Sequence, residues 1–375
     1  MDFNLTEERQ MLQDSLRRFL GDKYNTENRN SFIASEQGFS PDVWHGLAEL
    51  GMIGALFDAA DGGFGGAGFD LAVLFEELGR AGAVDPLLET GVLAGGLLAA
   101  LGNGGQKALL EEVIAGSLQL ALAHGEPAAR YDLNFVETRA QETSDGWVLN
   151  GHKAVVLNGG AADKLIVSAR SSGTAGEDDG ISLFLVDAER AGIERRSYGT
   201  LTGGHSADIR FNDCKLPADA LLGRAGGALP ALETAHARAI LAICAEALGA
   251  METAKDLTIE YLKTRQQFGR PIGKFQVLQH RMADVLIEIE QARSAVINAA
   301  GHLEDGDRDL HISAAKNLIG RVGRQVAEEA IQLHGGIGMT QEYDLGHFAK
   351  RIVLIDHLFG DTDHHLERFI ALCAA

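Results

Sequence analysis

The residue types best suited to chemistry lie in the segment RQQFGRPIGKFQ at positions 265–276. A long helical pattern ends here at a Gly-Arg-Pro turn, because proline cannot continue a helix. The Arg265 guanidinium can clamp a pyrophosphate through paired hydrogen bonds, and Phe268 places an aromatic ring beside it. The segment could also be a helix-breaking turn with Arg265 in solvent. Arginine, aromatic and glutamine side chains on one turn favour a ligand site.

A second candidate segment, QLHGGIGM at positions 332–339, follows the next long helical pattern. Gly335 and Gly336 would let the backbone lie against a cofactor, and Gln332 carries both a donor and an acceptor. Taken alone, a glycine stop at the end of a helix would be the simpler explanation. Its place behind the first segment favours a second ligand-binding segment.

The carboxylates and histidines near the C-terminus form a third group. Asp361 and Asp363 precede His364 and His365. Adjacent histidines on a helix diverge by about a hundred degrees, so they cannot easily bind one ion. We therefore expect a polar helix face here and no metal site, and we interpret Glu76 and its neighbour in the same way, as a charged helix face.

The pattern of apolar residues predicts the elements that hold these groups. Helical spacing begins at Thr6 and dominates residues 1–118, short strand-like runs fill residues 119–226, and long helical patterns return over residues 227–375. The expected fold is therefore mainly α, with an N-terminal helical domain, a small middle β domain and a C-terminal four-helix bundle. Strands and helices never alternate regularly, which excludes Rossmann and TIM-barrel folds.

Composition limits the partners. The chain of 375 residues carries a formal net charge of −20, which makes nucleic acid and anionic membrane surfaces poor partners. The three cysteines lack metal-ligand spacing and are odd in number, so a reducing cytoplasm is the expected location. We expect no membrane span and no targeting segment.

The two glycine-containing segments closely resemble the R-x-x-F-G-x-P-I-x-x-F-Q and Q-x-x-G-G-x-G motifs of the acyl-CoA dehydrogenase family. The resemblance implies an FAD-dependent oxidoreductase in which both segments hold the ADP half of an FAD bound mainly to a neighbouring subunit. The FAD contacts that it implies are Arg265, Gln267, Phe268, Phe275, Gln276, Gln332, Gly335 and Gly336.

Other segments extend the resemblance over nearly the whole chain. HGEP at 124–127 is similar to the family's T-E-P segment, and DGWVLNGHK at 145–153 is similar to its G-x-x-L-N-G-x-K strands. Together with YDL at 131–133 and FGDTDHHL at 359–366, they look most like the small-subunit branch represented by pimeloyl-CoA dehydrogenase.

Three positions near the flavin depart from the family pattern. Gly125 stands where a flavin-bonding threonine is common, and Val155 to Leu157 replace the motif W-x-T, whose tryptophan covers the flavin and whose threonine bonds its N5 edge. Either this branch repacks the pocket and binds FAD through backbone amides, or the local flavin half-site is lost.

The family's catalytic base is a glutamate in the motif Y-E-G-T, and this chain has none at the matching place. A gapless count gives Phe359, and shifts of one or two residues give Gly360 or Asp361, of which only Asp361 could serve. The alternative base position on the preceding long helix is Ala239, and the substrate-binding arginine beside it is replaced by Ile240.

Three hypotheses follow. The chain could be an acyl-CoA dehydrogenase with Asp361 as base, which oxidises an acyl-CoA substrate and passes electrons to an electron-transfer flavoprotein as a homo- or hetero-oligomer, dimeric or tetrameric. It could be a subunit that provides the ADP-binding half of an FAD site to a catalytic partner, as the pattern of kept and lost residues favours. It could also be a binding protein that kept only the fold. Fatty, dicarboxylic and ring-bearing acyl groups remain open as substrates.

Overall fold

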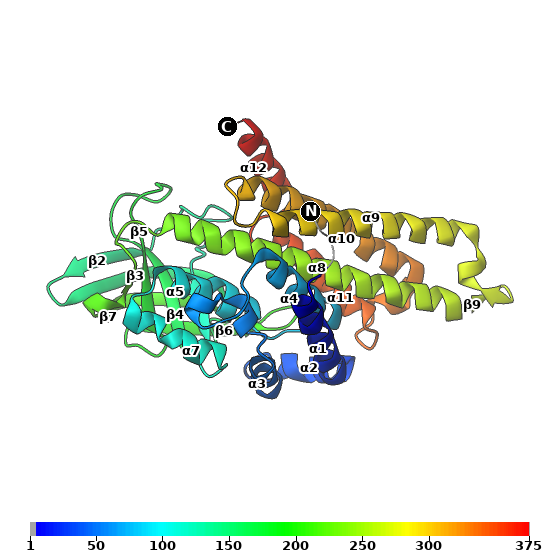
Figure 1. Ribbon diagram of the computed structural model, residues 1–375, viewed down its shortest axis with the longest axis horizontal. Helices are drawn as coiled ribbons and strands as arrows, with labels where there is room; N and C mark the ends of the chain where they lie inside the picture. The colour runs from blue at the N-terminus through cyan, green and yellow to red at the C-terminus, as the bar shows by residue number, and fades with distance from the viewer. Residues whose placement is uncertain (1–4, 375) are drawn as a thin grey trace. The chain divides into compact units, whose positions relative to one another are not determined.

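The computed structural model describes residues 5–374 of the chain (Figure 1). Its contacts divide the chain into two compact units, the first with residues 1–31, 67–83 and 240–375 and the second with residues 32–66 and 84–239. The predicted fold class is confirmed, because helices occupy both ends of the chain and a β domain lies between them in the sequence.

The first unit is helical. Its elements are α1 (Glu7–Lys23), α4 (Gly68–Ala81), the larger part of α8 (Leu229–Thr264), α9 (Gln276–Gly301), α10 (Arg308–His334), α11 (Leu345–His357), α12 (Thr362–Ala374) and the 3-10 turns Ile272–Lys274 and Gly335–Met339, and α2 (Thr26–Ala34) begins in it. The predicted start at Thr6 is confirmed, since its hydroxyl accepts a hydrogen bond from the Arg9 amide at 3.3 Å and caps α1.

Two glycines let α4 and α8 pack with their backbones in contact. A Cβ on Gly79 would lie 1.9 Å from the Glu246 carbonyl oxygen, and a Cβ on Gly249 would lie 1.9 Å from that of Glu76. Any larger residue at either position would push the helices apart. Arg293 of α9 donates to Glu76 at 3.0 Å, so an ion pair reinforces the same crossing. The expectation of solvated acidic side chains here is wrong, because Glu76 and Glu77 both form ion pairs with arginines.

The second unit combines short helices with the β domain. Its helical elements are α3 (Pro41–Glu49), the π-helical segment Leu88–Gly95, α5 (Gly96–Leu101), α6 (Gly104–Lys107), α7 (Leu109–Ile114) and the 3-10 turns Gly54–Leu56, Ala59–Asp61 and Ala218–Ala220. The strands are β1 (Leu120–Ala123), β2 (Arg139–Thr143), β3 (Gly146–Leu157), β4 (Lys164–Arg170), β5 (Ile181–Asp187), β6 (Ile193–Gly199), β7 (His205–Leu216) and β8 (Leu221–Leu222).

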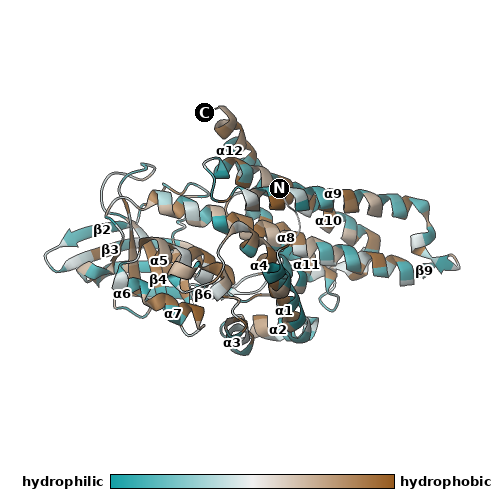
Figure 2. Cartoon of the chain, viewed as in Figure 1, coloured by the Kyte–Doolittle hydropathy of each residue, from teal (hydrophilic) through white to brown (hydrophobic). Residues whose placement is uncertain are grey.

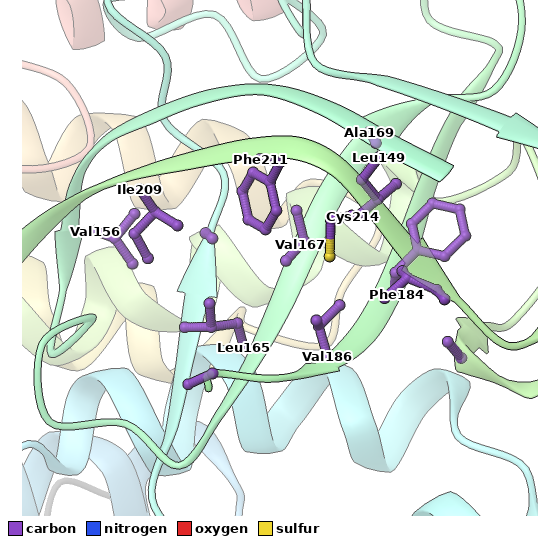
Figure 3. Packing of buried hydrophobic residues seen from close by; sticks show 14 of the residues in the cluster. Leu149, Val156, Leu165, Val167, Ala169, Phe184, Val186, Ile209, Phe211 and Cys214 are labelled. Atoms are coloured by element: carbon purple, nitrogen blue, oxygen red, sulfur yellow. The ribbon is translucent and has the colours of Figure 1, made fainter. Parts of the chain in front are cut away.

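The strands form one sheet in the order β6-β7-β3-β2-β4-β5-β8, with β1 paired parallel to β4. Inward residues of β3, β4, β5 and β7 meet in a single apolar core, which Figure 3 shows around Val167, Phe184 and Phe211. The register between β3 and β7 shifts between Lys153 and Val156, which marks a bulge. Among the described residues, no helix has the length and apolar character needed to cross a bilayer.

A buried ion pair connects β3 to the segment after β1. The Lys153 ammonium is fully buried and donates to the Glu126 carboxylate at 2.6 Å, the Ser168 hydroxyl at 3.0 Å and the His124 carbonyl at 3.1 Å. Burial lowers the pKa of Lys153 to about 8, and Glu126 opposes that shift. Burial also tends to raise the pKa of Glu126, but the charge of Lys153 and its hydrogen bond outweigh this and lower it.

We predict that Lys153→Met destabilises the chain by about 3–5 kcal/mol at pH 7, because Glu126 is left as an uncompensated buried charge. Urea unfolding followed by circular dichroism measures the loss. Adding Glu126→Gln to the variant should recover part of it.

The matched control is Lys164→Met, which removes an ammonium paired with Asp187 at the surface of the same sheet. Its cost should stay within about 1 kcal/mol. Equal losses for the two lysine variants would contradict the role assigned to the buried pair.

Candidate functional site

The first candidate segment forms a short hairpin where α8 ends. Strand β9 (Gln266–Gln267) pairs antiparallel with β10 (Arg270–Pro271), and the Ile272 amide donates to the Arg265 carbonyl at 2.8 Å to close it. The hairpin lies beyond the ends of α8 and α9 and is drawn mainly in teal, because its strands are polar (Figures 1 and 2).

The turn of this hairpin places an aromatic ring in solvent. Phe268 and Gly269 have φ angles of +54° and +77°, so both lie in the left-handed region, as a type I′ turn requires. The Phe268 ring is 90% exposed, and its edge meets Phe275, over which the Arg270 guanidinium lies at 4.2 Å. A non-glycine residue in this conformation costs about 1–2 kcal/mol. An exposed ring held at that cost is typical of a contact site.

Three aromatic rings join the hairpin to the second candidate segment. Tyr261 in the last turn of α8 stacks on His334 at the end of α10, with ring centroids 4.4 Å apart. His334 Nδ1 donates to the Ala330 carbonyl at 2.8 Å, and Nε2 accepts from the Tyr343 hydroxyl at 3.1 Å. Burial lowers the pKa of His334, which keeps this ring neutral. The sequence motifs at the ends of α8 and α10 are thereby brought to the same end of the first unit.

The predicted FAD contacts in these segments remain available for a ligand. Within residues 5–374, the side chains of Arg265, Gln267, Gln276 and Gln332 are exposed and form no hydrogen bond or ion pair. Nothing lies within 4 Å of a Cβ built on Gly335 or on Gly336, so the backbone there is open to close approach. One guanidinium, three amides and an open backbone make a donor set suited to a pyrophosphate.

In the second unit, the positions that replace W-x-T lack the side chains that contact a flavin in the family. Val155 has φ +52° and is 59% exposed, which is a strained conformation for a β-branched residue. No aromatic ring or hydroxyl stands at positions 155–157.

The backbone amides of this strand are already engaged within the unit. The Ala154 amide donates to the Gly125 carbonyl at 2.8 Å, that of Val155 to Asp208 Oδ1 at 3.2 Å and that of Asn158 to the His205 carbonyl at 2.8 Å. A Cβ on Gly125 would lie 3.3 Å from the Ala154 carbonyl oxygen, so a threonine there would be crowded. These residues do not offer the donors that a flavin edge would need.

The two positions of α8 that match the family's alternative base and arginine lie in the apolar interior. Ala239 is fully buried and Ile240 is nearly so. Neither side chain can accept a proton or bind an anion.

The backbone of the segment that matches the family's Y-E-G-T motif is held by one buried ammonium and one buried imidazole. Lys316 of α10 donates to the carbonyl oxygens of Asp356 at 2.7 Å and Gly360 at 2.6 Å, and His365 Nε2 donates to that of Phe359 at 3.0 Å. A Cβ on Gly360 would lie 2.6 Å from His365 Nε2, so no larger side chain fits at that position without rearrangement.

Asp361 has a structural partner. Its Oδ1 accepts from the His364 amide at 2.9 Å, and its carbonyl accepts from the His365 amide, so this carboxylate caps α12. The expectation of a polar helix face is wrong for His365, which is buried, and its ring is perpendicular to that of His364.

Sequence reasoning missed Tyr261 and Lys316 and gave no positioning role to His334 and His365, although these four side chains hold the candidate segments in place. Only weak sequence features indicated that these residues hold the segments in place. Lys316 lies in a strongly apolar stretch of α10, and His365 lies four residues after the Asp361 cap, on the face that packs inward.

Comparison with known proteins assigns the family. Three family models match: the N-terminal domain of acyl-CoA dehydrogenases over residues 6–117, the middle domain over 121–214 and the C-terminal domain over 230–371. The chain belongs to the acyl-CoA dehydrogenase family. This is a family of flavin-dependent oxidoreductases whose cofactor is FAD, so the predicted resemblance is confirmed at the level of the family.

Three similar proteins illustrate the range of the family. Cyclohex-1-ene-1-carbonyl-CoA dehydrogenase of Geobacter metallireducens is 32% identical over 318 residues, which are 82% of this chain and 83% of that protein. The structure of the Tcur3481-Tcur3483 steroid ACAD variant is 33% identical, covers 98% of both chains and has a TM-score of 0.87. The ChsE4-ChsE5 complex from Mycobacterium tuberculosis is 26% identical, with a TM-score of 0.89 over 100% of this chain and 99% of that one.

The fit of FAD to this chain is therefore uneven. The hairpin and the end of α10 offer free donors that suit the pyrophosphate, whereas residues 154–158 offer neither ring nor hydroxyl and use three of their amides internally.

The buried ring of His365 gives a prediction for pH dependence. Burial and the nearby Lys316 lower the pKa of His365 to about 3, so the folded chain disfavours the protonated ring. An unfolded chain protonates it near pH 6.5, and stability is therefore lost as the pH falls from about 6.5 toward 3. His365→Gln cannot titrate, so the stability difference between wild type and variant should shrink by about 1.4 kcal/mol per pH unit in that window.

Urea unfolding at pH 7.5 and pH 5.0 measures this difference. The control is His280→Gln, which makes the same replacement at an exposed position of α9. A difference that does not depend on pH for His365→Gln would contradict the neutral buried ring.

Proposed function

We propose that this chain is the supporting subunit of a heteromeric FAD-dependent acyl-CoA dehydrogenase. It provides the ADP-binding half of the cofactor site to a second dehydrogenase chain, and that partner carries the residues around the flavin and the glutamate base. The observation that carries the proposal is the contrast between a hairpin whose polar groups are free and a base segment whose polar groups are engaged.

The ADP half is assigned to the exposed groups at the end of the first unit. Arg265 would bind the pyrophosphate, Phe268 would pack on the cofactor or the partner, and the glutamines would bond its polar edges. Phe275 supports the turn from behind through its contact with Arg270. The full set is Arg265, Gln267, Phe268, Phe275, Gln276, Gln332, Gly335 and Gly336.

The chain alone lacks a free carboxylate at the positions where the family places its catalytic base. The chemistry that FAD supplies in this family is acceptance of the hydride from the β carbon, and a carboxylate must remove the α proton. Ala239 and Gly360 have no side chain that could do so, and the Asp361 carboxylate already caps α12. A partner with an intact glutamate completes the reaction.

The comparisons support a paired assembly. Two of the similar structures carry the names of two proteins joined as a pair, Tcur3481-Tcur3483 and ChsE4-ChsE5. We propose a heterodimer or heterotetramer of the same kind here, with an electron-transfer flavoprotein as electron acceptor. We also propose three domains, with residues 1–118, 119–226 and 227–375. We propose a cytoplasmic location for the complex.

We further propose a ring-bearing acyl-CoA as the substrate class. Two similar proteins are named for a cyclohexene acyl group and for a steroid. In a paired assembly, a pocket without the usual tryptophan, threonine and arginine near this chain leaves room that a linear acyl chain does not need.

A second candidate is a self-sufficient homo-oligomeric dehydrogenase with Asp361 as base. It is favoured by the position of Asp361, which is the one carboxylate in residues 358–361 and is only half-buried.

The first test concerns FAD retention by the purified complex. We predict that the chain alone retains little FAD and that co-expression with a dehydrogenase chain that has the W-x-T and glutamate motifs yields a yellow complex. In that complex, Arg265→Ala should weaken FAD binding by roughly 10- to 100-fold, because a charge-assisted bond to phosphate is lost. Released FAD per complex is measured after gel filtration.

The matched control is Arg324→Ala on α10, which removes an exposed arginine that pairs with Glu328. This variant should retain FAD. Near-stoichiometric FAD in the isolated wild-type chain, bleached by an acyl-CoA, would instead favour the self-sufficient enzyme.

The second test separates the cap from the base at Asp361. Asparagine caps helices as well as aspartate does but cannot accept the α proton. We predict that Asp361→Asn leaves kcat of the complex within about twofold, whereas a lost base would lower it by about 100-fold or more. Asp361→Ala should cost about 1 kcal/mol of stability in either case. A large loss of kcat in the asparagine variant, with unchanged unfolding, would establish Asp361 as the base.

A further inference from the structure

The turn between α9 and α10 brings two histidines and two aspartates together. His302 ends α9, Asp305 lies in the turn, and Asp307 precedes α10, whose first turn carries His311. All four lie within the first unit, and none belongs to the motifs that carry the proposed FAD function.

The polar atoms of this cluster converge. His302 Nδ1 lies 3.0 Å from Asp305 Oδ2 and 3.6 Å from Asp307 Oδ1, and His311 Nε2 lies 3.2 Å from Asp307 Oδ2. One ligand atom from each of His302, Asp307 and His311 can be chosen so that all three lie within 4.8 Å of one another. The two imidazole rings are stacked with centroids 3.8 Å apart.

His302 Nδ1 has an unusual environment. This atom is buried and forms no hydrogen bond within the described residues, although two carboxylates surround it. A buried polar atom without a hydrogen bond is destabilising, and a cation placed between the ring and the carboxylates would satisfy all of them.

We propose that His302, Asp307 and His311 form a binding site for a divalent transition-metal ion, with Zn²⁺ as the best match. Two imidazoles and one carboxylate suit Zn²⁺, Ni²⁺ or Cu²⁺, whereas Ca²⁺ and Mg²⁺ prefer oxygen ligands alone. Ligand atoms around Zn²⁺ lie about 3.3 Å apart. Side-chain rotation must therefore bring the ligand atoms of this cluster about an ångström or two closer together. Asp305 contacts His302 Nδ1 at 3.0 Å but is not one of the three converging ligands.

The surroundings of His311 support this role. Its Nδ1 lies 2.8 Å from the Asn298 amide, which can turn its oxygen toward the ring and fix Nε2 as the ligand atom. The neighbouring Arg308 donates to Asp309 at 2.9 Å, and Arg368 also pairs with Asp309, so both arginines are directed to that carboxylate. An ion here would join the end of α9 to the start of α10 and bind the folded chain in preference to the unfolded one.

The spacing H-x₄-D-x₃-H was visible in the sequence, which nevertheless predicted no metal. Asp307 and His311 are one helical turn apart, but the approach of His302 depends on the turn between the helices. Only the structure brings the three together.

Equilibrium dialysis of the tag-free, EDTA-treated chain against Zn²⁺ tests the site. Wild type should bind about one Zn²⁺ per chain above background, and the thermal unfolding midpoint should rise with Zn²⁺ concentration. Asp307→Asn and the pair His302→Gln/His311→Gln should weaken that binding at least ~10-fold and remove the thermal shift. His280→Gln, on the same helix but outside the cluster, should behave as wild type.

Equal Zn²⁺ content in wild type and the double variant would overturn the proposal, as would a thermal shift that survives both changes. In that event the cluster is a hydrogen-bonded and ion-paired staple of the turn. All variants are at or near the surface, and their far-ultraviolet spectra establish that they are folded. Because neither readout involves FAD or turnover, the result is independent of the proposed function.

Discussion

A buried ammonium fixes the segment that matches the family's Y-E-G-T motif. Lys316 is fully buried in the first unit, and burial lowers its pKa. Removing a cation from water costs several kcal/mol unless its protons are bonded, and here the carbonyl oxygens of Asp356 and Gly360 accept them at 2.7 and 2.6 Å. The path from α11 to α12 follows from this requirement, and so does a glycine at position 360, where a Cβ would meet His365. A glutamate at position 360 would therefore require His365 to move.

The two halves of the proposed cofactor site differ in whether their polar groups are already hydrogen-bonded within the chain. Around Val155 and Asp361, amides and carboxylate are bonded within their own unit. Within residues 5–374, the side chains of Arg265 in the hairpin and Gln332 near the end of α10 form no hydrogen bond or ion pair, and Phe268 is exposed. Groups bonded internally would have to give up those bonds to bind a ligand, whereas free groups only exchange water. This difference supports the proposal that the chain binds the ADP half of FAD at the end of the helical bundle and not the flavin at the strand.

The sequence predicted the parts of the molecule that local patterns determine. Thr6 caps α1 because a threonine hydroxyl bonds a nearby amide, and the hairpin forms where Pro271 excludes a helix. The family follows from motifs of the same local kind. The stacking of Tyr261 on His334 could not be predicted, because it joins helices that are distant in sequence. Nor could the burial of His365, since divergence of adjacent histidines on a helix does not say which one points inward.

Backbone strain and exposed apolar surface at two positions favour a partner for this chain. Phe268 and Val155 are both exposed and both have positive φ angles, so the isolated chain bears strain of about 1–2 kcal/mol at each together with exposed apolar surface. Within the described residues, Phe268 meets only the edge contact with Phe275, and the Val155 amide bonds Asp208 while its side chain stays exposed. A partner that covers the Phe268 ring gains its apolar area, about 25 cal/mol for each Å² removed from water, and meets a turn that is already formed. In the proposed complex, the strain at the Phe268 turn acts as preorganisation, because the free chain already holds the turn in the conformation that the partner would contact.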